Sequence, residues 1–314
     1  MASDDLALAV DIGGTKLAAA LVELQGRIAG YARVETPTGL DGEALWRTLV
    51  ALLGKLLAEH GDPPLAGVGV GCGGPMTWPA AEVSPLSIPA WRDFPLRDRL
   101  AERFPPIPVR VHNDAVCVAV GEHWRGAGRG SANVLGLVVS TGVGGGLVLD
   151  GRLVDGASGN AGHIGHIIVD PTGPDCLCGG RGCLEAVARG PNLVAWAQAQ
   201  GWRPGSAATG VDLSTDAARG HPIATAALRR AGRALGVAIA SATHLCDLEV
   251  VAIGGGLSQA GARLFDPLEE TFRAHARMDF AREVRVVPAG LGQTAGLVGA
   301  AAFIFAADPY WHAA

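Results

Sequence analysis

The chain has 314 residues, of which 49% are hydrophobic and 18% charged, and its formal net charge is −5. A chain of this length and hydrophobic content can bury the cores of two domains. The acidic balance offers no basic field to nucleic acid or to an anionic membrane, so a small molecule is the expected partner. Six cysteines and no signal-like N-terminal segment predict a cytoplasmic protein with reduced thiols.

The N-terminal segment predicts two strands joined by a glycine turn. An apolar run from 6 to 10 leads into the turn, and a second apolar run follows from 17 to 24. Such a turn presents backbone N–H groups, a hydroxyl and an ammonium to phosphate groups, and its aspartate could bind an accompanying Mg²⁺. Alone this pattern is weak, because many glycine hairpins hold no ligand. The turn residues are Asp11, Gly13, Gly14, Thr15 and Lys16.

Leucines between 43 and 60 recur at helical spacing, which predicts a helix with one buried face. A strand from 65 to 70 then enters a glycine-rich turn, where the backbone at Gly74 could contact a polar ligand. The segment 78–91 is rich in Pro and Ser and predicts an irregular loop.

A further strand, 107–111, is followed by His112, Asn113 and Asp114 and then by a helix from 115 to 123. Polar residues at the carboxyl end of a strand are typical ligand groups in α/β folds. Asn and Asp are also common N-caps, so Asp114 is interpreted as a general base, a helix cap or both.

The order of strand, glycine turn and strand recurs at 134–149, so the chain looks like two related halves with one phosphate loop each. A third glycine cluster follows a strand at 248–253 and allows a base or ribose to approach the backbone. The uncharged runs 131–149 and 289–307 are broken by glycines and predict a sheet segment and a buried helix, not membrane spans. The candidate nucleotide-binding residues in these loops are Thr141, Gly142, Gly144, Gly145, Gly254, Gly255 and Gly256.

Three cysteines with the spacing C-x-C-x4-C lie among glycines at 176–183, and His166 precedes them. This Cys3His set is typical of structural zinc. The alternative is packed or disulfide-bonded cysteines, but Cys176 and Cys178 are too close for an easy mutual bridge. The other thiols, Cys72, Cys117 and Cys246, are predicted to be buried.

Taken together, these motifs resemble the ROK family of sugar kinases and sugar-responsive repressors over about residues 8–305. The most specific part is the cysteine cluster with the Leu-Glu that follows it. The resemblance implies an α/β protein with the actin-like ATPase (ribonuclease H-like) fold and a central cleft. It implies a smaller domain of residues 1–115, on which a C-terminal helix at 298–314 packs, and a larger domain of residues 116–297.

The resemblance also implies ATP with Mg²⁺ as cofactors, structural Zn²⁺, and a hexose as substrate. Asp114 matches the family's catalytic base. His163 departs from the family's usual glutamate, which leaves open whether this position donates or accepts a hydrogen bond. The implied sugar-binding residues are Gly74, Asn113, Asp114, His163, His166 and Glu185, and the implied metal ligands are His166, Cys176, Cys178 and Cys183.

The leading hypothesis is an ATP-dependent kinase that phosphorylates the 6-hydroxyl of glucose. The same chemistry on an amino or N-acetyl hexose (N-acetylmannosamine, N-acetylglucosamine, kanosamine) or on a carbocyclic sugar analogue is the alternative. A sugar-sensing repressor is disfavoured, because only seven residues precede Leu8. Polyphosphate could replace ATP as donor, and a homodimer is expected from the resemblance alone.

Overall fold

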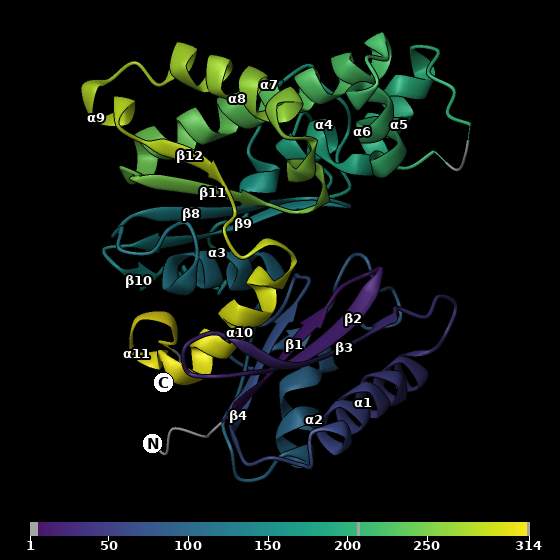
Figure 1. The fold of residues 1–314 in the computed structure, drawn as a ribbon, viewed down its shortest axis with the longest axis vertical. Coiled ribbons are helices and arrows are strands. Elements are labelled where there is room, and N and C mark those ends of the chain that lie inside the picture. Colours follow the sequence, from purple (N-terminus) through teal and green to yellow (C-terminus); the bar gives the residue numbers. More distant parts are fainter. Residues whose placement is uncertain (1–5, 206–207, 313–314) are drawn as a thin grey trace.

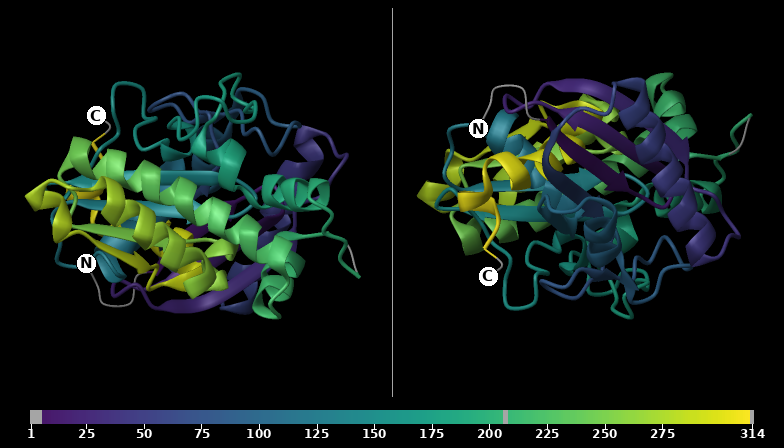
Figure 2. Two further views of the ribbon diagram at one scale, coloured as in Figure 1. Left: turned by 90° about the horizontal axis from the view of Figure 1, so that it is seen from above. Right: turned by 90° about the horizontal axis from the view of Figure 1, so that it is seen from below.

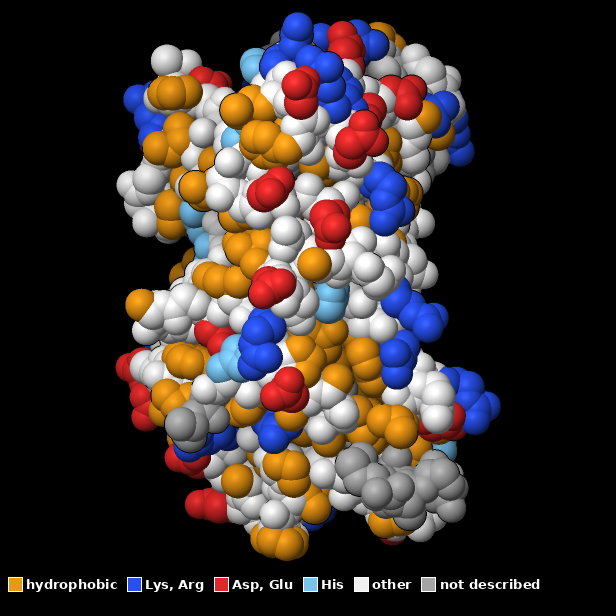
Figure 3. Space-filling view, turned by 90° about the vertical axis from the view of Figure 1, so that its left-hand side faces the viewer, with side chains coloured by type: hydrophobic (Ala, Val, Ile, Leu, Met, Phe, Trp, Pro, Cys, Tyr) orange, Lys and Arg blue, Asp and Glu red, His pale blue; other side chains and the backbone are white. Residues whose placement is uncertain are grey.

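The computed structural model describes residues 6–205 and 208–312, and it consists of two lobes stacked along the long axis (Figure 1). The molecule is narrower between the two lobes, as the space-filling view shows (Figure 3). Each lobe is built on a five-stranded sheet, with strand orders β3-β2-β1-β4-β7 and β10-β9-β8-β11-β12. In each sheet one antiparallel three-stranded unit continues into two parallel strands. The two related halves predicted from the glycine turns are therefore confirmed as two sheets of the same topology.

The sheet of the first lobe comprises β1 (Leu6–Ile12), β2 (Lys16–Val22), β3 (Ile28–Glu35), β4 (Leu65–Cys72) and β7 (Val109–Asn113). The sheet of the second lobe comprises β8 (Val134–Val139), β9 (Val143–Leu149), β10 (Arg152–Leu153), β11 (Val250–Gly254) and β12 (Arg285–Pro288). A short hairpin pairs β5 (Glu82–Val83) with β6 (Phe94–Pro95).

The first sheet buries both faces because its strands alternate two kinds of apolar residue. On β1 the larger side chains, Leu8 and Val10, pack into a core with α1 (Gly42–Glu59) and α2 (Leu96–Arg103). The smaller ones, Ala7 and Ala9, pack into another core with α3 (Asp114–Arg125) and α10 (Ala295–Phe305). The predicted leucine stripe of α1 is confirmed, since its six buried residues are Leu45, Leu49, Leu52, Leu53, Leu56 and Leu57.

Helices α3 and α10 form the layer between the two sheets (Figure 1). They approach so closely that a Cβ on Gly299 would lie 1.6 Å from the carbonyl oxygen of Cys117. Only glycine can occupy such a contact, so this interhelical spacing depends on the absence of a side chain at 299. The other side of α3 packs against β8 and β9 of the second sheet.

The outer face of the second sheet is covered by α7 (Pro222–Cys246) and α8 (Ala262–His275), which run side by side (Figure 2). Their core contains Leu235, Leu268 and Phe272, all fully buried. The remaining elements are η1 (Ile164–His166), α4 (Leu184–Ala188), α5 (Gly190–Ala199), α6 (Gly210–Ala218), η2 (Gly256–Ala260), α9 (Asp279–Arg282), η3 (Gly292–Thr294) and α11 (Ala307–Tyr310).

Two expectations require correction. Cys72 and Cys117 are buried as predicted, but Cys246 is only partly buried, because it closes α7 where the helix meets the surface. The C-terminal helix starts at Ala295, ends at Phe305 and is followed by the short α11, since Ala306 leaves helical geometry. Residues 1–5 and 313–314 of the proposed domain limits lie outside the described residues, and those limits stay a prediction. Among the described helices, none combines the length and apolar character that crossing a membrane requires.

Candidate active site

The carboxyl ends of three neighbouring strands bring the predicted catalytic residues to one edge of the first sheet. The register pairs Asp11 of β1 with Gly71 of β4, and Gly71 with His112 of β7. One residue further along, Cys72 lies between Ile12 and Asn113. Two segments that are a hundred residues apart in the sequence therefore converge there, as the parallel pairing requires.

Asn113, and not Asp114, is the N-cap of α3. The Asn113 side chain accepts a hydrogen bond from the backbone N–H of Ala115 at 2.9 Å. Asp114 is the first residue of the helix, and its Oδ1 also accepts from the N–H of Ala115, at 2.8 Å. Burial, reinforced by the nearby Asp11, raises the pKa of Asp114 to about 6. A carboxyl group with this pKa is mostly ionised at neutral pH yet basic enough to accept a proton.

The first glycine turn is closed around the Asp11 and Lys16 pair. Lys16 Nζ lies 3.7 Å from Asp11 Oδ2, and burial raises the pKa of Asp11 although Lys16 opposes this. Thr36 was not predicted from the sequence. Its hydroxyl donates to the Gly13 carbonyl at 2.6 Å and its N–H to the Thr15 carbonyl, so it holds the turn in shape. No motif marks Thr36, because the contact spans more than twenty residues.

The second glycine turn is shorter than its glycine run. Thr141 and Gly142 are exposed at the tip, whereas Gly144 and Gly145 lie inside β9. A Cβ on Gly144 would be 2.7 Å from the Cβ of Ala115. This glycine therefore also allows α3 to pack on the strand, which the sequence motif did not reveal.

The third glycine turn lies against the second. Gly255 has φ +90°, and a Cβ there would be 2.3 Å from the carbonyl oxygen of Val139. Both the conformation and the contact require glycine. A Cβ on Gly256 would lie 3.7 Å from the hydroxyl of Ser140, so Gly254–Gly256 and the Thr141 turn share one edge of the second sheet.

The four predicted metal ligands converge. The ligand atoms of His166, Cys176, Cys178 and Cys183 all lie within 4.8 Å of one another. His166 presents Nδ1 to this group, 3.8 Å from Cys176 Sγ. Three thiols and one imidazole at this spacing fit a tetrahedral zinc ion. With Nδ1 directed at the cysteines, Nε2 of His166 stays available to another ligand.

Glu185 connects the cysteine cluster to the second glycine turn. It belongs to α4, which begins directly after Cys183. Its Oε2 accepts a hydrogen bond from the Val143 N–H at 2.9 Å. This hydrogen bond links the helix that follows the cysteine loop to the turn at 141–143.

The tautomer of His163 is determined by a single contact. Its Nδ1 lies 2.9 Å from the carbonyl oxygen of Asn160. A carbonyl oxygen can only accept, so Nδ1 carries the proton and Nε2 of the neutral ring can only accept a hydrogen bond. Partial burial lowers the pKa of His163, which favours the neutral ring.

Two of the predicted sugar-binding residues, Asn113 and His163, approach each other beside Gly74. A Cβ on Gly74 would lie 3.3 Å from Asn113 Nδ2 and 3.9 Å from His163 Nε2. The amide of Asn113 and the imidazole of His163 thus point toward the same small space from opposite lobes. Ser87 was not predicted, yet its side chain fills the position of a Cβ on Gly14, so the loop after Pro85 packs against the first glycine turn.

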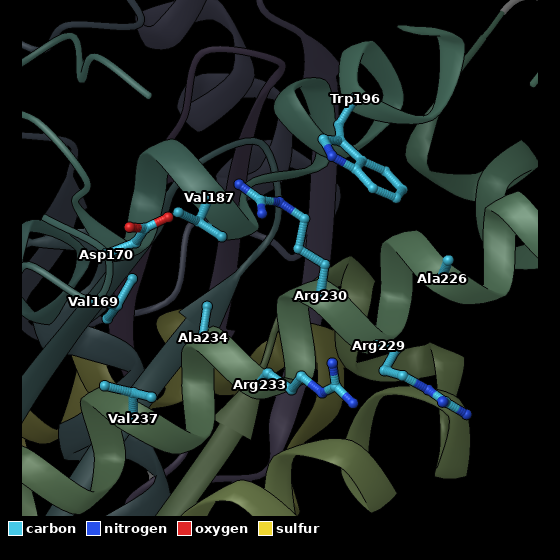
Figure 4. Close-up of a pocket in the computed structure, with 10 residues that line it drawn as sticks. All are labelled: Val169, Asp170, Val187, Trp196, Ala226, Arg229, Arg230, Arg233, Ala234 and Val237. Atoms are coloured by element: carbon cyan, nitrogen blue, oxygen red, sulfur yellow. The ribbon is translucent and has the colours of Figure 1, made fainter. Parts of the chain in front are cut away.

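A hollow of about 490 Å³ lies elsewhere, beside α7, and none of the residues predicted from the sequence lines it (Figure 4). Its side chains include Trp196, Arg229, Arg230 and Arg233. In Figure 4 Arg230 extends toward Val187, whereas the two other arginines leave the helix on another side. The three guanidinium groups do not converge on one point.

The family model of the ROK family matches residues 7–307. A glucokinase of Halalkalibacterium halodurans is 36% identical over 95% of this chain and 94% of its own length. An N-acetylmannosamine kinase of Yersinia pseudotuberculosis is also 36% identical, over 94% of this chain and 96% of its own. A ROK family glucokinase from Streptomyces griseus, solved in complex with glucose and AMPPNP, superposes with a TM-score of 0.83 and 34% identity over 94% of this chain and 98% of that one.

The similarity extends along the chain from the first glycine turn to the last helix. The similar solved structures have the actin-like ATPase fold. The fold expected from the motif order is therefore confirmed. The chain belongs to the ROK family.

Proposed function

We propose that the protein transfers the γ-phosphoryl group of ATP to the 6-hydroxyl of a hexose, with glucose as the preferred acceptor and Asp114 as general base. The observation that carries this proposal is the half-buried carboxyl of Asp114, with a pKa raised to about 6, at the strand edge that also holds Asp11 and Asn113. The glucokinases similar to this chain support the choice of hexose.

In this reaction Asp114 accepts the proton of the sugar hydroxyl as its oxygen bonds to phosphorus. A free oxygen of Asp114 is available for this, since Oδ1 is the atom that accepts from Ala115. The turns at 13–16 and 141–142 offer backbone N–H groups to the phosphates, and Lys16 adds a positive charge. A Mg²⁺ ion held near Asp11 would neutralise charge on the phosphate oxygens.

The acceptor character of His163 fits a hexose that presents a hydrogen-bond donor at this position, as a sugar hydroxyl does. An acetamido N–H can also donate to Nε2, whereas its carbonyl oxygen cannot, so the choice of glucose rests on the similar glucokinases. The sequence alone left both roles open, and the contact with Asn160 removes the donor role from the neutral ring. Phosphorylation of N-acetylmannosamine, the reaction named for another relative, is the second candidate.

The test is ADP release with glucose, mannose, N-acetylmannosamine, N-acetylglucosamine and kanosamine as acceptors. We expect glucose to have the highest kcat/KM, and Asp114→Asn to lower kcat by about 10²–10⁴ while glucose affinity changes little. The matched control is Asp98→Asn, an exposed carboxylate on α2 that should leave both constants unchanged. Full activity of Asp114→Asn would exclude this residue as the base.

We further propose that the Cys3His cluster holds one structural zinc ion and that the protein is a homodimer. The converging thiols support the first proposal, and family membership supports the second. Sedimentation should give about twice the 32.0 kDa of the chain. A monomer at all concentrations would exclude the dimer.

A further inference from the structure

A buried hydrogen bond between two side chains crosses between the lobes next to the proposed catalytic residues. His112 is the next-to-last residue of β7, precedes Asn113, and is 1% exposed. Its Nε2 lies 3.1 Å from Oδ1 of Asp155, a residue of the second lobe whose side chain is 11% exposed. The pair therefore joins the strand that carries Asn113 and Asp114 to the segment that follows β10.

The protonation of the His112 ring follows from its two contacts. Nδ1 accepts a hydrogen bond from the backbone N–H of Asn113 at 2.7 Å. Nε2 must then carry the proton and donate it to the Asp155 carboxylate. Each ring nitrogen thus has one defined partner, and rotation of the ring would break both hydrogen bonds.

The segment that Asp155 anchors ends at His163. Its backbone is closed by a hydrogen bond from Ala161 N–H to the Asp155 carbonyl oxygen at 3.0 Å. Two residues later, the ring of His163 is oriented by Asn160. The position of Nε2 of His163 therefore depends on where Asp155 holds the loop.

Aromatic packing fixes the same junction. The ring centroid of Trp78 lies 4.8 Å from the ring centroid of His112 and 5.0 Å from that of Trp311. Trp78 also occupies the space of a Cβ on Gly159, in the middle of the segment anchored by Asp155. Phe303 of α10 also stacks on His112, with the ring centroids 5.7 Å apart.

We propose that His112 and Asp155 are positioning residues that set the distance between Asp114 and Asn113 on one lobe and His163 on the other. Neither side chain touches the reacting atoms. Their effect is on how well one hexose can contact both lobes at once, so this inference rests on the proposed function. Misplacement of a substrate-contacting group by about 1 Å can cost up to about 10²-fold in rate.

The experiment replaces the acceptor of the buried His112 N–H. Asp155→Ala leaves this N–H without a partner and frees the loop, and we expect KM for glucose to rise about tenfold or more, with KM for ATP changed less than about threefold. Asp155→Asn keeps an oxygen acceptor at the same place and should stay close to wild type in KM for glucose. The control is Asp308→Asn, which alters an exposed pair with Arg152 of the neighbouring β10.

A double-mutant cycle separates positioning from simple stabilisation. In a His163→Ala background, Asp155→Ala should no longer raise KM for glucose, because the group it positions is gone. Equal KM increases in both backgrounds would overturn the proposal, as would a lowered melting temperature of Asp155→Ala with unchanged KM. If Asp155→Ala does not fold, a large KM increase in Asp155→Asn would equally contradict it.

Glucose titrated calorimetrically into wild type and variants gives the same comparison without turnover. Should wild-type protein bind and phosphorylate no hexose, the proposed function itself fails. Should wild type phosphorylate glucose while the variants bind it as tightly as wild type, only the positioning role is wrong.

Discussion

At the scale of one residue, Asp114 has to be both partly buried and ionised, and burial opposes ionisation. As the proposed base, its side chain must be accessible to a sugar, yet burial, reinforced by Asp11, raises its pKa to about 6. A base with this pKa loses its function when protonated. We therefore expect kcat/KM for glucose to be constant above about pH 7 and to fall tenfold per pH unit well below 6.

A pH series of initial rates with saturating ATP checks this expectation. The residual activity of Asp114→Asn should lack the acidic limb, because no carboxyl group titrates at that position. An acidic limb of the same midpoint in the variant would assign the titration to another group.

The same pKa shift predicts a cost in stability. A carboxyl whose pKa is raised in the folded state favours folding below its unfolded pKa near 3.8, and this contribution is lost as pH rises through about 6. At pH 8 the ionised Asp114 thus destabilises the fold, and Asp114→Asn should be more stable by about 1–3 kcal/mol. Urea unfolding at pH 8 measures the difference, which should shrink toward pH 4; a variant less stable at pH 8 would contradict it.

At the scale of elements, the cysteine loop acts through α4. Cys183 ends the loop, Glu185 follows in the first turn of α4, and Oε2 of Glu185 holds the N–H of Val143. If zinc organises this loop, losing one cysteine ligand should loosen both His166 and the second glycine turn.

The corresponding prediction concerns Cys178→Ser. We expect wild type to contain about one zinc per chain. The metal affinity of the variant should be about tenfold lower or more, and it should bind glucose more weakly. Metal analysis and glucose titration give both quantities, and Cys246→Ser, a cysteine outside the cluster, is the control. Normal glucose binding by metal-free protein would show that the cluster has no organising role.

Short-range motifs made much of this site predictable. The glycine turns, the Asn113-Asp114 pair and the cysteine spacing are each local in sequence. The strand register places Asp11 and Asn113 at one sheet edge, and the cysteine ligands converge within their own loop. Contacts between distant segments were not predictable. Thr36 supports the first glycine turn across the lobe, and Asp155 meets His112 across the interlobe boundary. Neither residue belongs to a motif, so only the fold reveals its partner.

Some motif residues also have a structural role, which the motif does not reveal. Gly144 permits close packing of α3 on β9, and Asn113 caps α3 while its amide nitrogen faces Gly74. When a ligand and a packing contact both require the same residue type, the sequence shows only that one residue. The sequence therefore identified these positions without revealing what their second contact is.

At the scale of the molecule, one buried side chain binds the backbone segment that passes from the second lobe to the first. Glu122 of α3 is fully buried. Its oxygens accept hydrogen bonds from the N–H groups of Ala127, Gly290 and Leu291, at 2.8, 2.8 and 2.9 Å. The last two residues belong to the passage from β12 of the second lobe to α10, which packs on the first. Three backbone donors are satisfied by a side chain that can only accept.

Glu122→Gln should therefore destabilise the whole protein, although it changes size very little. Whichever position the new amide nitrogen takes, at least one backbone N–H loses its acceptor, and a buried unpaired donor costs about 1–3 kcal/mol. Glu249→Gln is the matched control, because this exposed glutamate accepts from Ala132 and Asn133 through Oε2 alone, and an amide can keep its oxygen there and turn its nitrogen to water. Urea unfolding followed by fluorescence and circular dichroism compares the two variants. Equal stabilities would mean that the Glu122 carboxylate does not secure the passage between the lobes.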